Sequence, residues 1–320
     1  MRQLYRITAL ILICLFSGIA YAQDYPSRPI KWIVGYPPGG TTDVLARLMA
    51  QGLSEKLGQQ VIVENKPGAG NNIATEFVVN AAPDGYTMLL VNPANFINAT
   101  LYKTLNFNFV RDIAPVAGIA RTPNVMVVSN SVPAKTVAEF LAYCKENPGK
   151  VNMASSGSGT SVHLSGELFK FMTGCNMVHV PYKGAGPALI DLTAGQVQVL
   201  FDNLPSSVPH IKNGRIRALA VTSAAAEPSM PELPTVGATV TGYEATASFG
   251  IGMPRNTPPE AISKINAAVN QILADPAMKA RLADLGGVTI PGTSADFGKI
   301  IVNETEKWAK VINASGVKLD

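Results

Sequence analysis

Two loops rich in glycine and hydroxyl groups are the segments of this sequence best suited to bind an anion. The first, at residues 35–43, is GYPPGGTTD, and the second, at residues 155–161, is SSGSGTS. Each follows a short apolar run and precedes a helical pattern, so each is predicted to lead into a helix N-terminus. Free backbone N–H groups and the helix dipole attract negative charge there. We therefore predict one anion-binding loop in each half of the chain.

The first loop is not expected to bind a nucleotide. Its glycines Gly35 and Gly40 are spaced as in a Walker A loop, but Thr41 stands where that motif needs lysine. For either loop alone, an ordinary strand-to-helix turn with capping hydroxyls is the alternative. Further candidates follow strand-like runs: Asn203 as an amide donor to a ligand, and Lys183 as a partner for a carboxylate, the alternative being a solvated lysine. Asn92 and other asparagines on loops of the first half are further candidate donors, with turn formation as the alternative.

Enzymatic chemistry has little support in the sequence. The chain has three histidines, and none lies in a metal-binding spacing with another histidine or a cysteine. No Gly-x-Ser-x-Gly motif surrounds a serine. Because His163 falls in the first turn after the second loop, one enzyme hypothesis stays open, a secreted serine hydrolase that uses a serine of residues 155–161 with His163. No metal and no cofactor are expected.

The N-terminus has the pattern of a secretory signal peptide. Arg2 and Arg6 precede an apolar run over residues 7–20, and the small residues Ala20 and Ala22 stand at positions −3 and −1 of a cleavage site. The run is shorter than the roughly 20 residues of a membrane span. We therefore expect residues 1–22 to be removed after Ala22 and the protein to be periplasmic.

Composition sets further limits. The chain has 320 residues, a length that favours two lobes, and its formal net charge is +4. It has no basic stripe with interleaved aromatic residues, so nucleic acid is not an expected partner. Cys144 and Cys175 are a candidate disulfide in an oxidising compartment, and two buried thiols are the alternative.

Alternating strand and helix patterns predict an α/β fold with mainly parallel sheets covered by helices. Strands are predicted over residues 28–36, 61–64, 87–92, 124–129, 151–155, 177–181, 196–203 and 216–222. Helices are predicted from residue 41 to 57, up to about residue 81, from residue 136, and over residues 162–173, 187–194, 258–274, 276–285 and 294–313. Ligands of such sheets bind in crevices at the carboxyl ends of the strands, and the crevice between two facing lobes is the predicted site.

Several motifs together resemble one protein family. They stand in order along essentially the whole chain after residue 22: Tyr36-Pro37-x-Gly39-Gly40-x-x-Asp43, Glu64-Asn65-x-x-Gly68-Ala69-Gly70, Pro83-Asp84-Gly85-Tyr86-Thr87, His179-Val180-Pro181-Tyr182-Lys183-Gly184, Ala218-Leu219-Ala220-Val221-Thr222 and Leu233-Pro234-Thr235. The set resembles the Bug-type receptors, which are the solute-binding proteins of tripartite tricarboxylate transporters.

The resemblance implies a Venus-flytrap protein with two α/β lobes joined by crossing strands. Residues 23–122 plus 247–320 would form the first lobe, and residues 123–246 the inserted second lobe. A small carboxylate would be held between the two loops, with contacts from Tyr36, Gly40, Thr41, Asp43, Ser155, Ser156, Gly159, Thr160 and Asn203. The receptor, expected to be a monomer, would deliver its ligand by transient docking to integral-membrane transporter subunits. A receptor that feeds a sensor protein instead is the alternative within the same fold.

Overall fold

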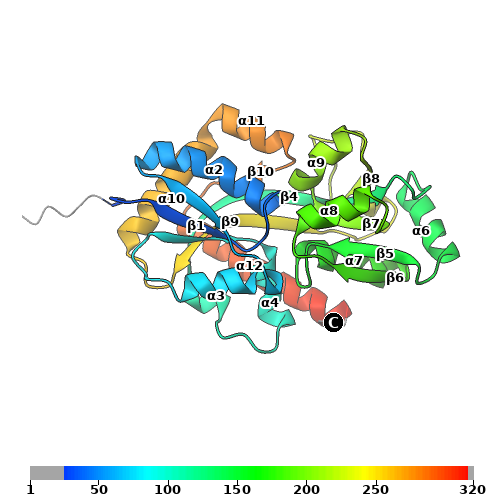
Figure 1. The fold of residues 1–320 in the computed structure, drawn as a ribbon, viewed down its shortest axis with the longest axis horizontal. Helices are drawn as coiled ribbons and strands as arrows, with labels where there is room; N and C mark the ends of the chain where they lie inside the picture. Colours follow the sequence, from blue (N-terminus) through cyan, green and yellow to red (C-terminus); the bar gives the residue numbers. More distant parts are fainter. Residues whose placement is uncertain (1–24, 316–320) are drawn as a thin grey trace, which may run out of the picture.

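A computed structural model of the chain describes residues 25–315, so the predicted signal peptide at residues 1–22 lies outside the described residues. The strands make one path, β2-β1-β3-β9-β4-β7-β5-β6, with β10 and β8 also paired to β4. Figure 1 shows the two halves of this path side by side, each with helices on both faces. The strand bounds are β1 Ile30–Val34, β2 Val61–Asn65, β3 Thr87–Val91, β4 Ile113–Ser129, β5 Val151–Ser155, β6 Met177–Pro181, β7 Val199–Asn203, β8 Ile216–Val221, β9 Thr246–Pro254 and β10 Val288–Thr289.

Each half contains a parallel core and an antiparallel border. In the first half β1 is parallel to β2 and β3, and β9 is antiparallel to β3 and β4. In the second half β5 is parallel to β6 and β7, and β4 is antiparallel to β7 and β8. The predicted α/β class with mainly parallel sheets is therefore confirmed, because helices connect the parallel strands across both faces.

The long strand β4 belongs to both halves. Its residues 113–123 pair with β9, and its residues 124–129 pair with β7 and β8. The chain thus enters the second half along β4 and returns along β9, which runs beside it.

The sequence predicted only the last third of β4 and none of β9. Pro115 and Pro123 argue against a central strand because proline donates no backbone hydrogen bond. In the structure the β4–β9 register shifts beside Pro115 and again after Gly118, so Pro115 and Gly118 occupy irregular points of the ladder. In β9, Gly250 lies against the ring of Phe297, where an added Cβ would come within 2.2 Å of that ring.

The helices cover four sheet faces, each over one cluster of buried apolar side chains in the described chain. In the first half α2, α10 and α11 pack on one face, and α3, α4 and α12 on the other. In the second half α6 and α7 pack on one face, and α8 and α9 on the other. The helix bounds are α2 Thr41–Leu57, η1 Ala69–Asn71, α3 Asn72–Val79, α4 Pro93–Leu101, α5 Phe109–Asp112, α6 Val137–Glu146, α7 Ser161–Thr173, α8 Ala185–Thr193, α9 Leu204–Lys212, η2 Val236–Ala238, α10 Pro259–Ala274, α11 Pro276–Asp284 and α12 Ser294–Ser315.

Cys144 on α6 and Cys175 after α7 form a disulfide in the structure, with their Cα atoms 5.8 Å apart. Both side chains lie in the core beneath α6 and α7. The bridge therefore joins two helices that cover the same face of the second half.

Candidate functional site

A pocket lies where the two halves of the molecule meet, and five helices begin at its wall. The helices are α2 and α4 from the first half and α7, α8 and α9 from the second, which begin after Gly40, Asn92, Thr160, Gly184 and Asn203. The full lining is Tyr36, Gly40, Thr41, Thr42, Asn92, Pro93, Ser156, Thr160, Ser161, Ala185, Asn203 and Phe249. The sequence predicted two helix N-termini here, and the structure adds three.

The lining contains no charged side chain. The electrostatic character of the pocket therefore comes from the helix N-termini, whose unpaired N–H groups and dipoles favour an anion. This arrangement suits a small anion that is held by backbone groups and hydroxyls without an ion pair.

The first predicted loop contributes Tyr36, Gly40 and Thr41 to the wall, whereas Asp43 lies behind it. Asp43 Oδ2 accepts a hydrogen bond from the Gly39 N–H at 3.2 Å. Burial acts to raise the pKa of Asp43, but hydrogen bonds from Arg47, Asn65 and that N–H outweigh it and hold the pKa below its ordinary value. The Asp43 carboxylate thus stabilises the turn and leaves the pocket neutral.

Asn65 ties the same turn to β2. Its side-chain amide donates to Asp43 Oδ1 at 3.0 Å and to the Tyr36 carbonyl at 2.8 Å. In the motif Glu64-Asn65, Asn65 thus supports the first loop from the side away from the pocket. Sequence spacing could not separate this supporting role from a contact with the ligand.

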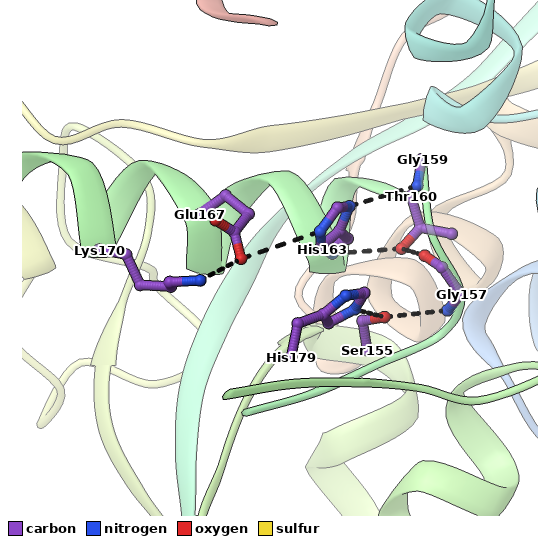
Figure 2. A network of polar contacts seen from close by, with 8 residues as sticks. All are labelled: Ser155, Gly157, Gly159, Thr160, His163, Glu167, Lys170 and His179. Atoms are coloured by element: carbon purple, nitrogen blue, oxygen red, sulfur yellow. Dashed lines mark hydrogen bonds and ion pairs between the residues drawn. The ribbon is translucent and has the colours of Figure 1, made fainter. Parts of the chain in front are cut away.

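The second predicted loop is supported by two stacked histidine rings, as Figure 2 shows. The rings of His163 and His179 have centroids 4.0 Å apart. His179 Nε2 lies 2.7 Å from Ser155 Oγ, and Ser155 Oγ accepts a hydrogen bond from the Gly157 N–H. His163 Nδ1 accepts one from the Gly159 N–H at 3.3 Å.

Of the predicted residues in this loop, Ser156 and Thr160 line the pocket, and Ser155 and Gly159 do not. Ser155 is fully buried beneath the loop. Thr160 Oγ1 caps α7 by accepting from the His163 N–H, and it donates to the Gly157 carbonyl. The hydroxyl groups of Ser155 and Thr160 therefore both have structural partners, and Thr160 lines the pocket as well.

The serine–histidine pair of the hydrolase hypothesis does not occur as predicted. His163 bonds a backbone N–H and lies 3.9 Å from Glu167, and burial, with smaller effects of His179 and Lys170, lowers its pKa to about 3. The serine that does pair with an imidazole is Ser155, on His179, and it is 0% exposed. A nucleophile must reach its substrate, and this one does not reach the surface.

Asn203 lines the pocket at the start of α9. Lys183 lines a neighbouring cavity, which shares Tyr36 and Ser156 with the first pocket. Asn92, a candidate donor in the sequence, also lines the pocket, whereas Ser161 and Phe249 were not among the predicted contacts. Asn92 ends the strand predicted over residues 87–92, and in the structure it caps helix α4, which the sequence did not predict.

The two halves touch on both sides of the pocket. Thr41 Oγ1 donates to Ser206 Oγ at 3.0 Å across the cleft. On another side Gly159 packs so closely on Asn98 that an added Cβ would lie 2.1 Å from Asn98 Oδ1. The two halves are therefore in direct contact at both of these places.

Residues 25–315 contain neither a candidate metal cluster nor a candidate membrane-spanning helix. No group of three or more histidine, cysteine, aspartate or glutamate side chains in this range is placed to hold a metal ion. In the same range no helix combines the length and apolar character needed to cross a bilayer.

Comparison with known proteins identifies the family. The family model described as "Tripartite tricarboxylate transporter family receptor" matches residues 45–317. The protein BugT of Bordetella pertussis is 36% identical over 311 residues, which are 95% of this chain and 95% of BugT.

Solved structures agree with this result. The structure of R. palustris Rpa4515 with adipate has a TM-score of 0.90 and 38% identity, over 92% of this chain and 99% of that chain. MatC from Rhodopseudomonas palustris with bound malate has a TM-score of 0.86 and 29% identity, over 90% of this chain and 100% of the MatC chain. The chain therefore belongs to the receptor family of the tripartite tricarboxylate transporters, the extracytoplasmic solute-binding proteins that include the Bug proteins.

Proposed function

We propose that this protein is a periplasmic receptor that captures a small carboxylate between two lobes and delivers it to a tripartite transporter. The observation that carries the proposal is the convergence of five helix N-termini on one uncharged pocket. Carboxylates are small anions that such N–H groups bind well. Two solved relatives hold adipate and malate, both of which are dicarboxylates.

The proposed lobes are residues 23–122 plus 247–320 and residues 123–246. The strand pairing supports this division, since β4 changes partners between residues 123 and 124 and β9 begins at Thr246. β4 and β9 would then form the hinge. The second cavity, which shares Tyr36 and Ser156 with the pocket, leaves room for the remainder of a longer ligand.

We further propose that the receptor is a monomer that catalyses no reaction and docks transiently on the membrane subunits of its transporter. Residues 1–22 would act as the signal peptide, with cleavage after Ala22. The burial of Ser155 and the engagement of His163 support the absence of hydrolysis.

A thermal-shift screen tests the proposal. The protein is unfolded and refolded to remove bound ligand, and is then heated with small mono-, di- and tricarboxylates. A ligand at 100-fold its Kd stabilises the folded state by about 2.7 kcal/mol, which raises Tm on the order of 5 °C for a chain of this size. Failure of every carboxylate to raise Tm would refute the receptor proposal.

A matched pair of variants then places the ligand. Thr160 and Thr136 both cap helices by accepting a backbone N–H, but only Thr160 lines the pocket. Thr160→Leu and Thr136→Leu should both lower Tm, because each loses one cap worth about 1 kcal/mol, and Thr160→Leu should lower it more, because it also loses the bond to the Gly157 carbonyl. Only Thr160→Leu should weaken carboxylate binding, measured by calorimetry. Unchanged affinity in that variant would remove the second loop from the site.

A further inference from the structure

A chain of hydroxyl groups crosses the cleft and ends at a buried carboxylate. Thr41 Oγ1 lies 3.0 Å from Ser206 Oγ, and Ser206 Oγ contacts both Asp202 Oδ2 and the Asn203 carbonyl. Ser207 Oγ donates to the same Asp202 oxygen at 2.8 Å. Asp202, at 0% exposure, does not line the pocket itself, so it acts on the pocket through Ser206 and Thr41.

The chemistry of these groups sets the direction of each hydrogen bond. The Asn203 carbonyl can only accept. Burial raises the pKa of Asp202 to about 6, despite hydrogen bonds from Ser206 and Ser207 that lower it, so the carboxylate is mostly ionised at neutral pH and also accepts. Ser206 therefore donates its one proton to an acceptor of its own lobe. Its oxygen must receive the Thr41 proton, and Thr41 Oγ1 offers the pocket only lone pairs.

Asn203 presents a second acceptor. Asn124 Nδ2 lies near three oxygens, which include Ser165 Oγ at 2.8 Å and the Phe201 carbonyl at 2.9 Å, so the Asn124 amide has a defined orientation. Its Oδ1 accepts from Asn203 Nδ2, which also donates to Ser161 Oγ at 3.1 Å. Both amide protons of Asn203 are thus used, and within the described chain its Oδ1 accepts no hydrogen bond.

The pocket therefore combines N–H donors for an anion with two oxygens that need a donor from the ligand. We propose that the ligand is a hydroxycarboxylate whose hydroxyl donates to Thr41 Oγ1, with Asn203 Oδ1 as a second acceptor. This inference rests on the proposed function and narrows its ligand class. An ammonium group could also donate, but the helix N-termini repel a cation and no acidic side chain lines the pocket to offset that repulsion.

Matched pairs of acids test the proposal on the refolded protein by calorimetry. Each pair differs by one hydroxyl: lactate and propionate, malate and succinate, citrate and tricarballylate. Within the pair that binds, the hydroxy acid should bind about tenfold or more tightly. The deoxy acid lacks the hydroxyl group, so it leaves a desolvated acceptor of the pocket without a hydrogen bond. Equal or tighter binding of the deoxy acid would refute the hydroxyl assignment and leave the receptor proposal intact. Aspartate binding more tightly than malate would also refute it, in favour of an ammonium group, whereas failure of all acids would refute the receptor proposal itself.

Variants separate the positioning role of Ser206 from a merely structural one. Ser206 and Ser207 donate to the same carboxylate oxygen, but only Ser206 receives the Thr41 proton. Ser206→Ala frees that proton to point into the pocket, so the affinity ratio of hydroxy to deoxy acid should fall toward one. Ser207→Ala is the matched control and should leave the ratio unchanged, whereas a loss of selectivity in both variants would refute the relay. Thr41→Val should also abolish the selectivity, and Thr41→Ser should retain it.

Discussion

Gly159 offers a direct test of closure, because a single methyl group there separates the folding of a lobe from the closing of the cleft. Its φ is +80°, a conformation that costs a non-glycine residue about 1–2 kcal/mol. Its added Cβ would also meet Asn98 Oδ1 of the other half at 2.1 Å. The first cost is present in the open and closed forms alike, whereas the second arises only on closure.

The size of the closure cost follows from what holds Asn98. Its side-chain amide donates to the Gly70 carbonyl at 2.9 Å and to Asn72 Oδ1 at 3.0 Å. Room for the methyl group requires the loss of both bonds, each worth about 0.5–1.5 kcal/mol. Gly159→Ala should therefore weaken ligand binding by roughly 5- to 150-fold, because that energy is lost only in the closed form.

Gly174→Ala is the matched control, since Gly174 ends the same helix with φ +70° and has nothing within 4 Å of an added Cβ. Both variants should lower Tm similarly, and only Gly159→Ala should weaken binding in calorimetry. Asn98→Ala in the Gly159→Ala background should restore much of the affinity. Equal affinities for the two single variants, or no rescue by the second change, would show that the cleft does not close on this contact.

Two further predictions concern stability. The disulfide between Cys144 and Cys175, 31 residues apart, should stabilise the fold by about 3–4 kcal/mol through loop closure, so the double alanine variant should unfold at a clearly lower denaturant concentration; unfolding at the concentration of the oxidised wild type would contradict this. Because burial raises the pKa of Asp202 from 3.8 to about 6, the folded state binds more protons than the unfolded state between those pH values. The contribution of Asp202 to the free energy of unfolding should be fully present below about pH 4 and should fall by roughly 3 kcal/mol as the pH rises to 6. Asp202→Asn should remove this pH dependence in denaturant melts. Persistence of the same dependence in the variant would show that another group causes it.

The sequence allowed the two loops that line the pocket to be found because the pattern that marks them is local. A strand, a glycine-rich turn and a helix are consecutive in the chain, so Thr41 and Thr160 could be placed at helix starts from spacing alone. Asn92 and the start of α8 reach the same pocket only through the pairing of distant strands. No local pattern shows that five helices share one point.

The parts of the fold that were missed have the opposite character. β9 has two glycines, Gly250 and Gly252, whose lack of a side chain admits Phe297 and Ile113 from other elements. Helix α9 contains Pro205 and Pro209, which weaken its helical pattern although it forms in the structure. Tertiary packing overrides local propensity at these places, and a single sequence does not contain that packing as a periodic signal.

The division of the pocket between the lobes connects binding to motion. An open form would present the ends of α2 and α4 on one lobe and those of α7, α8 and α9 on the other, and only closure places all five around one anion. Each helix end contributes about 0.3–1 kcal/mol, so the two or three ends added on closure favour the closed form by roughly 1–3 kcal/mol. A ligand shifts a conformational equilibrium only by this difference in affinity. Because no charged side chain lines the pocket, we expect the negative charge of the ligand itself to draw the two lobes together.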